Sequence, residues 1–301
     1  MQPQVITGLQ QLDETIQFMT NQLADTSKKT YLSHMRYFSN WLADNGLTFF
    51  AATDVDISAY RKHLLDTHAK QSASTMLVVT KRLYVIAFHR KLLVIDPAEY
   101  VNNIQADTDE TPYRTLTVNE AKTILDGIDT TRLQGMRDYM IIAILIRTGI
   151  RRAELASLTT ASLSTELGHT IVTYIGKSNK RSKAVIAGDV AKKLAIYMKR
   201  ANLTRDKDEP LFTSMTNGKG TGKSLTGRQI TRIVHKHSNA VDLDISPHAL
   251  RATFITVTLG NGAKLEDVQR TVHHANSRTT LHYQTNKDSI TNNASKFFPE
   301  I

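Results

Sequence analysis

Residues 148–155 read TGIRRAEL, which is the pattern of a helix end, a turn and the start of a new helix. Gly149 stands where a helix ends, because glycine adopts the left-handed conformation of a helix C-cap without strain. Arg151 then lies in the turn, and Glu154 follows one helical turn later, so their side chains share a face. By itself the stretch also fits a surface ion pair, and spacing alone does not choose between Arg151 and Arg152.

A basic hairpin follows. Residues 170–175 and 183–187 alternate between apolar and polar side chains, and GKSNK at 176–180 between them has the composition of a turn. The pattern predicts two antiparallel strands. The turn region is basic, with Lys177, Lys180 and Arg181.

A third pattern begins at Ser246. Serine is a good N-cap and Pro247 is a good first helical residue, so a helix is predicted to begin here. His248 and Arg251 then lie three residues apart on its first turn, where both can face one phosphate. Taken alone, the pair fits an exposed basic helix end better than a phosphate site.

The last pattern precedes the C-terminal region. Ser277 is placed to cap a final helix that carries Tyr283, and His273 and His274 come just before it. A tyrosine on a late helix is usually a packing residue with a hydrogen-bonded tip. The pattern around Tyr283 therefore indicates a function only when it is considered together with the three patterns that precede it.

Charge and cysteine content narrow the function classes. Residues 1–112 hold 10 Lys and Arg against 12 Asp and Glu, a net charge of −2, whereas residues 113–301 hold 28 against 16, a net of +12. A basic second part suits a polyanion such as nucleic acid, because phosphate neutralisation releases counterions. With no cysteine in the chain, disulfides, thiolate zinc sites and cysteine nucleophiles are excluded.

Other signals are weak or absent. No apolar run reaches the roughly 18 residues of a membrane span, and the N-terminus lacks a secretory signal, so a cytoplasmic location is expected. Residues 217–224 read NGKGTGKS, which has asparagine where a phosphate-binding loop needs its first glycine, and we interpret them as a flexible basic loop between helices. Histidines at 235, 237, 273 and 274 lack suitable partners for metal binding, and no cofactor is expected.

The chain divides into two predicted domains. Residues 1–101 are interpreted as a small helical bundle, with helices that begin at Ser27, at Thr53 or Asp54, and near Ser74. The polar, acidic residues 102–112 are interpreted as a linker.

Residues 113–301 are predicted to form a second domain. It begins with a capping box at Thr117 and Glu120, contains a helix that ends at Gly149 and then the hairpin, and is mostly helical after Asp189.

The order and spacing of these patterns resemble the tyrosine recombinase (phage integrase) family. The matched strings are TGIRRAEL, a GK turn, PHALR and HHANSRTTLHY. His274 precedes Tyr283 by nine residues and follows His248 by 26, as in compact Xer-like members. Val272-His273 replaces the family's Leu-Gly, but the nine-residue spacing favours His274 as the motif histidine. The resemblance is strong over residues 115–290 and looser over 25–100.

The resemblance implies a mainly α fold of two domains. The first is a SAM-like core-binding helical bundle. The second is an α+β catalytic domain with a small antiparallel sheet.

The resemblance also implies a metal- and ATP-independent site-specific recombinase. Tyr283 would be the nucleophile that forms a 3′-phosphotyrosyl intermediate, and Lys177 would protonate the leaving 5′-oxygen. The remaining roles are phosphate clamping by Arg151 and Arg251, proton-transfer assistance by His248, phosphate hydrogen bonding by His274 and orientation of neighbours by Glu154. Alternatives are a topoisomerase IB-like relaxing enzyme and an inactive DNA-binding regulator.

The implied partner is double-stranded DNA with a short inverted-repeat core site, bound by a homodimer and, in synapsis, by a homotetramer. Such enzymes integrate, excise or resolve DNA, often in mobile elements, and the segment before Ser27 is too short for an additional arm-binding domain. The tail that ends in FFPEI at 297–301 is expected to dock into a neighbouring subunit. Candidate DNA contacts are Lys28, Lys29, Lys81, Arg82, Arg152, Lys180, Arg181 and Arg228.

Overall fold

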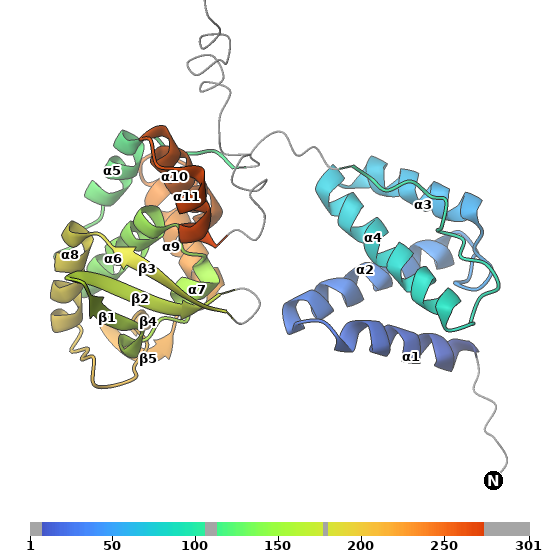
Figure 1. Cartoon of the computed structure of the whole chain (residues 1–301), viewed down its shortest axis with the longest axis horizontal. Helices are drawn as coiled ribbons and strands as arrows, with labels where there is room; N and C mark the ends of the chain where they lie inside the picture. The colour runs from blue at the N-terminus through green and yellow to red at the C-terminus, as the bar shows by residue number, and fades with distance from the viewer. Residues whose placement is uncertain (1–7, 106–112, 177–179, 274–301) are drawn as a thin grey trace, which may run out of the picture. The chain divides into compact units, whose positions relative to one another are not determined.

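A computed structural model describes residues 8–105, 113–176 and 180–273. The chain divides into two compact units, Met1–Thr108 and Asp109–Ile301 (Figure 1). Within the described ranges, none of the helices is long and apolar enough to cross a membrane.

The first unit is a helical bundle. Its helices are α1 (Gly8–Asn21), α2 (Asp25–Asp44), α3 (Asp54–Thr67) and α4 (Lys70–His89). The other three helices all pack against α4. An aromatic group fills the core, in which the rings of Phe38 and Tyr60 lie 4.7 Å apart and those of Phe49 and Tyr84 stack at 4.4 Å. Burial of these large rings is the main source of the bundle's stability.

The helix starts in this unit are only partly as predicted. Thr53 caps α3 as expected, in a reciprocal capping box with Asp56. The starts at Ser27 and Ser74 are wrong, because α2 and α4 begin earlier, after Ala24 and Ala69 in extended conformation. Both serines lie inside their helices, so burial of the apolar faces outweighs the local capping preference.

Two further features of the first unit correct the sequence prediction. Helix α1 was not predicted, yet it buries Met19 in the core. The linker does not begin at residue 102, because Ile104 is 5% exposed within the same core and its carbonyl accepts a hydrogen bond from Ser74 Oγ at 2.8 Å. The sequence analysis missed this contact because Ile104 is an isolated apolar anchor within the polar, acidic residues 102–112.

The second unit has an α+β architecture. Its helices are α5 (Val118–Asp126), α6 (Leu133–Thr148), α7 (Arg152–Ala156), the 3₁₀ helix η1 (Thr160–Ser162), α8 (Gly188–Arg200), α9 (Gly227–Asn239), α10 (Pro247–Gly260) and α11 (Leu265–Val272). Helix α6 is the centre of the core, since every residue from Met140 to Leu145 is at most 1% exposed. The predicted fold class, mainly α with an α+β second domain that contains a small antiparallel sheet, is confirmed, and the structure adds a second, two-stranded sheet.

The predicted basic hairpin is confirmed. Strands β1 (Leu163–Glu166), β2 (His169–Ile175) and β3 (Arg181–Ile186) form an antiparallel sheet in that order. Strand β3 begins two residues earlier than predicted, and its last pair places Ile175 opposite Arg181. The turn is closed by a 2.8 Å hydrogen bond from the Gly176 amide to the Lys180 carbonyl, and residues 177–179 lie outside the described ranges.

A second hairpin contradicts the prediction for residues 217–224. They do not form a loop between helices, since β4 (Thr213–Thr216) and β5 (Lys219–Ser224) pair antiparallel. Asn217 and Gly218 form the tight turn with φ values of 52° and 76°. An Asn-Gly pair favours such positive-φ turns, and this signal outweighs the glycine-rich composition of β5.

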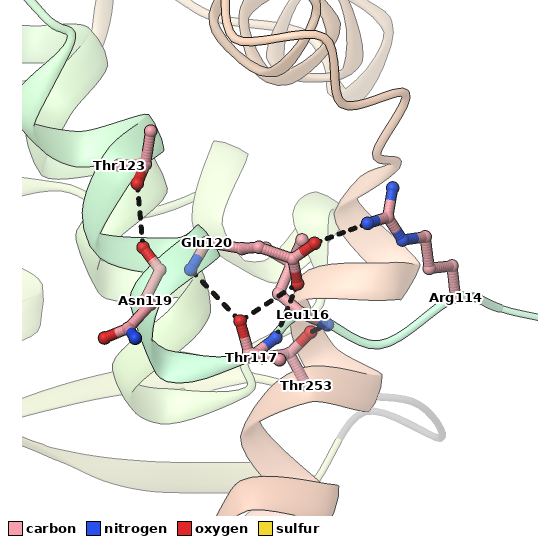
Figure 2. A network of polar contacts seen from close by, with 7 residues as sticks. All are labelled: Arg114, Leu116, Thr117, Asn119, Glu120, Thr123 and Thr253. Carbon is pink, nitrogen blue, oxygen red and sulfur yellow. Dashed lines mark hydrogen bonds and ion pairs between the residues drawn. The ribbon is translucent and has the colours of Figure 1, made fainter.

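The start of α5 is fixed by a capping box, as predicted (Figure 2). Thr117 Oγ1 accepts a hydrogen bond from the Glu120 amide at 3.2 Å, and Glu120 Oε2 accepts one from the Thr117 amide at 2.8 Å. These hydrogen bonds lower the pKa of Glu120, and Arg114 pairs with its other oxygen. Leu116 donates its amide to Thr253 Oγ1 of α10 at 2.9 Å, so the entry segment of this unit is attached to α10.

Candidate functional site

The first turn of α10 presents the predicted histidine and arginine. Ser246 caps the helix by accepting a hydrogen bond from the Ala249 amide at 3.2 Å, and Pro247 occupies the first turn, both as predicted. His248 is exposed, whereas Arg251 is only 6% exposed. The helix start therefore positions one basic group at the surface and one inside the protein.

Arg251 joins three separate parts of the second unit. Its Nη1 donates to the Gly149 carbonyl at 2.6 Å, and its Nη2 donates to the Val272 carbonyl at 2.5 Å. Gly149 caps the end of α6, and Val272 is the last residue of α11. A planar guanidinium suits this task because its donors have fixed directions. Arg251 thus sets the positions of the segments that lead to Arg151 and to His274.

Gly149 is required by both conformation and space. Its φ is +63°, in the left-handed region, and a Cβ built there would lie 2.6 Å from the Phe254 ring. Any side chain would therefore strain the backbone and displace α10. The predicted end of the helix at this glycine is confirmed, and it directs the chain into Arg151.

Arg151 and Glu154 form a bracket around the start of α7. Glu154 Oε2 accepts the Arg151 amide at 2.8 Å, and Oε1 accepts Arg151 Nη1 at 2.9 Å. Glu154 is 6% exposed and the Arg151 side chain 29%, so the pair is not the solvated surface ion pair of the simpler interpretation. The carboxylate fixes the direction of the guanidinium, which is the geometry that an orienting role for Glu154 requires.

The two adjacent arginines have different partners. Arg152 is exposed and donates Nη1 to Thr231 Oγ1 on α9 at 2.8 Å. Only Arg151 is paired with the buried Glu154 among the interactions described. The structure thus separates two residues that spacing alone could not distinguish.

The end of the first hairpin lies against this bracket. A Cβ built on Gly176 would lie 3.5 Å from Glu154 Oε1 and 3.3 Å from Ser182 Oγ. The base of the turn is therefore beside the Arg151–Glu154 pair. Lys177 itself lies outside the described residues.

Tyr174 on β2 lies in the same cluster and was not singled out by the sequence. It is 6% exposed, and burial together with the negative charge of Glu154 raises its pKa to about 12, although Arg251 and Arg151 act in the opposite direction. Its ring contacts that of His273 edge-on, with centroids 6.0 Å apart. His273 ends α11 with φ +52°, whereas the predicted site residues His274 and Tyr283 lie outside the described ranges.

His248 has a ring partner that the sequence did not predict. Tyr113 stacks on it with centroids 5.5 Å apart and an interplanar angle of 23°. Partial desolvation lowers the pKa of His248, and the positive charges of Arg152, Arg251 and Arg151 lower it further. A neutral imidazole, which has one acceptor nitrogen, is therefore favoured near neutral pH.

The basic residues predicted to contact DNA differ in accessibility. Six are exposed: Lys29, Arg82, Arg152, Lys180, Arg181 and Arg228. Lys28 and Lys81 are half-buried. Lys28 Nζ donates to Asn21 Oδ1 at 2.9 Å, and Lys81 Nζ donates to the Val101 carbonyl. The prediction is weakest for these two, because their ammonium groups already hold protein oxygens.

Histidines of α9 have carboxylate partners. His235 pairs with Asp244 at 2.8 Å. His237 pairs at 3.0 Å with the buried Asp138, which also binds Arg137. Throughout the part of the chain that the structure describes, we find no group of three or more His, Asp or Glu side chains arranged to hold a metal.

Comparison with known proteins identifies the family. The chain is 28% identical to tyrosine recombinase XerC of Myxococcus xanthus over 262 residues, and this match covers 85% of each chain. It is 27% identical to tyrosine recombinase XerD of Lacticaseibacillus casei over 274 residues, and this match covers 87% of this chain and 88% of the relative. XerH site-specific recombinase bound to a palindromic difH substrate shares the fold, with a TM-score of 0.71 at 16% identity over 97% of this chain and 86% of the other. The model of the phage integrase family matches residues 114–289. Because that match spans more than half of the chain, the protein belongs to the phage integrase family of site-specific tyrosine recombinases.

Proposed function

We propose that the protein cuts and rejoins double-stranded DNA through a covalent bond between Tyr283 and a 3′ phosphate. The observation that supports this most is the clustering of the described motif residues. Arg151 contacts Glu154, and Glu154 lies beside Gly176. The charges of Arg151 and Arg251 act on both His248 and Tyr174. Motif segments far apart in sequence thus gather at one place.

The proposed reaction is a transesterification. The Tyr283 oxygen attacks the scissile phosphorus, a Tyr–O–P bond forms, and the bond from phosphorus to the 5′-oxygen breaks. The tyrosine proton passes to the neutral imidazole of His248, and the departing 5′-oxygen gains a proton from Lys177, which leaves a free 5′-hydroxyl. A 5′-hydroxyl of a second strand then attacks the phosphotyrosine in reverse. One phosphodiester replaces another, so no ATP is consumed.

The remaining groups stabilise and orient. Arg151 and Arg251 supply positive charge for the non-bridging oxygens, since fixed donors stabilise charge that develops in the transition state. Neutral His248 assists proton transfer, His274 hydrogen-bonds the phosphate, and Glu154 directs Arg151.

A nicked suicide substrate tests the proposal. When the short strand beside the cleavage point diffuses away, religation fails and the covalent adduct accumulates. We expect the adduct with the wild type and none with Tyr283→Phe, while Tyr100→Phe, on an exposed tyrosine of the first unit, behaves like wild type. If Tyr283→Phe still formed the adduct, the assignment of the nucleophile would be wrong.

The family assignment favours recombination over the two alternatives. A relaxing enzyme would relax a supercoiled plasmid that carries one site, whereas a recombinase needs two sites to give a recombinant product. An inactive regulator would bind the site but form no adduct. Product analysis on one-site and two-site plasmids therefore distinguishes the three functions.

The proposed DNA substrate is a short core site with inverted repeats, bound by two copies of the chain. Two related folds support this, since one solved complex holds XerH on palindromic difH and another is a lambda integrase dimer on a core site. In the first unit, α4 contains Lys70, Lys81 and Arg82 and no acidic residue. Replacing the exposed Arg82 with alanine should reduce the salt dependence of binding by about one counterion, whereas Lys62→Ala on the acidic α3 should not.

Assembly into a tetramer during synapsis completes the proposal, and the tail that ends at residues 297–301 would dock into a neighbouring subunit. Truncation after Asn292 should impair synapsis more than binding to a single site; an equal loss of both would contradict this role. The bacterial relatives suggest action in the cytoplasm of a prokaryotic cell, on the chromosome or a mobile element.

A further inference from the structure

The stack between Tyr113 and His248 lies outside the motifs that define the family resemblance. The two rings are nearly parallel, at 23°, with centroids 5.5 Å apart, and Tyr113 is 36% exposed. One face of the imidazole is therefore covered by an aromatic ring. A stack of this kind restricts the rotation of both rings.

Contacts on the residues that follow hold Tyr113 in place. Arg114 pairs with Glu120 of the α5 capping box, and Leu116 is bound through its amide to Thr253 of α10 (Figure 2). Helix α10 also carries His248 on its first turn. The backbone that carries Tyr113 is thus fixed to the same helix as its ring partner, so the stack has a defined geometry.

The surroundings of His248 give the stack a chemical consequence. The positive charges of Arg152 and Arg151, at the start of α7, and of Arg251, on the same helix as His248, all act on the imidazole. These three cations disfavour a further positive charge, and coverage of the ring removes water that would solvate one. Both effects favour the neutral imidazole.

We propose that Tyr113 is a positioning residue for His248. The ring of Tyr113 fixes the orientation of the imidazole and keeps it neutral beside the reacting phosphate. The proposal rests on the proposed function only in assigning His248 to the reaction. Tyr113 directly follows residues 106–112, which contain the boundary between the two units.

An NMR titration of the full chain tests the stack without any DNA. The His248 Cε1–H signal, assigned by its loss in His248→Gln, should titrate at a higher pH in Tyr113→Ala than in the wild type. Tyr113→Phe retains the ring and should titrate like the wild type. Tyr100→Ala, which removes an exposed tyrosine of the first unit, is the matched control and should have no effect. An unchanged titration in Tyr113→Ala would overturn the proposal.

The rate of adduct formation on the suicide substrate tests the consequence for the reaction. We expect Tyr113→Ala to lose about 3- to 10-fold near pH 6 and less near pH 8, because more of its His248 is protonated at the lower pH. Tyr113→Phe should restore the wild-type profile. A uniform loss at every pH would indicate a purely structural role and overturn the inference. If the wild type formed no adduct, the proposed function would fail, while the titration would still decide the stack.

Discussion

The two hairpins of the second unit both contain lysines but differ in how they are anchored. The first has Lys177 and Lys180 in its turn region, and the second has Lys219 directly after its turn and Lys223 near its base. Strand β3 alternates exposed and buried residues, so one face of the first hairpin belongs to the core. Every residue of β5 is exposed. Thus burial of strand side chains fixes the first hairpin, whereas in the second only Thr213 at the base of β4 is buried.

The difference in anchoring supports our proposal that the turn of the first hairpin, and not that of the second, belongs to the site. Gly176 at the end of the first hairpin lies beside Glu154 of the Arg151 bracket, since a Cβ built there would be 3.5 Å from Glu154 Oε1. The second hairpin is held at its base, where the Thr213 carbonyl accepts a 2.8 Å hydrogen bond from the buried Arg137. Strands anchored beside the bracket suit a contact at a constant distance, whereas an exposed ribbon is suited to looser contacts.

The largest expected effect is that of Lys177→Ala. Loss of a positioned general acid should lower the rate of adduct formation by about 10²- to 10⁴-fold. A substrate with sulfur in place of the 5′-oxygen should restore most of the rate, because a thiolate leaves without a proton. Lys183→Ala, on the same hairpin but with its ammonium group paired with Glu166, is the matched control and should stay near wild type. Failure of the sulfur substrate to rescue Lys177→Ala would remove Lys177 from the role of acid.

The second effect concerns the anchor of the second hairpin. Arg137→Ala should lower the free energy of unfolding by about 3 to 5 kcal/mol, because it leaves the Asp138 carboxylate buried with one partner fewer. Arg147→Ala removes an exposed ion pair with Asp189 and should cost at most about 1 kcal/mol. Chemical denaturation of both variants provides the measurement. Equal stability of the two variants would mean that the buried pair is not the anchor.

The third effect separates the two hairpins by their glycines. Gly176→Ala should slow adduct formation by about 3- to 10-fold, because its Cβ would crowd Ser182 Oγ and shift the chain beside Glu154. Gly222→Ala in the second hairpin should instead lower stability by about 1 kcal/mol, because its φ of +72° is strained for alanine. The main effect of Gly176→Ala should therefore be on the cleavage rate, and that of Gly222→Ala on thermal unfolding. A slower reaction in Gly222→Ala would contradict the distinction.

The smallest effect is expected on the surface of β5. The double variant Lys219→Ala and Lys223→Ala removes two exposed charges and should change adduct formation by less than about twofold. The comparison with Lys177→Ala is made on the same substrate and at the same salt concentration. A loss in the rate of adduct formation as large as that of Lys177→Ala would indicate that the second hairpin belongs to the site.

Sequence reasoning succeeded where the determining interactions are local. The caps at Thr53, Thr117 and Ser246 and the helix end at Gly149 depend on groups within a few residues of each other, and all four are confirmed. It failed where burial outweighs local preference, as at Ser27, which lies inside α2 rather than at its start. It also missed the β4–β5 turn, although Asn-Gly was a local signal that should have been used.

The sequence alone determined the family, through the order and spacing of Arg151, Lys177, His248, Arg251 and Tyr283, and it predicted one hairpin and most of the helix caps. Only the tertiary structure decided which of two adjacent arginines is paired with Glu154, that Arg251 joins Gly149 to Val272, and that Tyr113 covers His248. The physical reason is separation along the chain. Caps and turns form between neighbours, whereas the contact from Arg251 to Gly149 spans 102 residues and exists only after a shared core has brought the segments together.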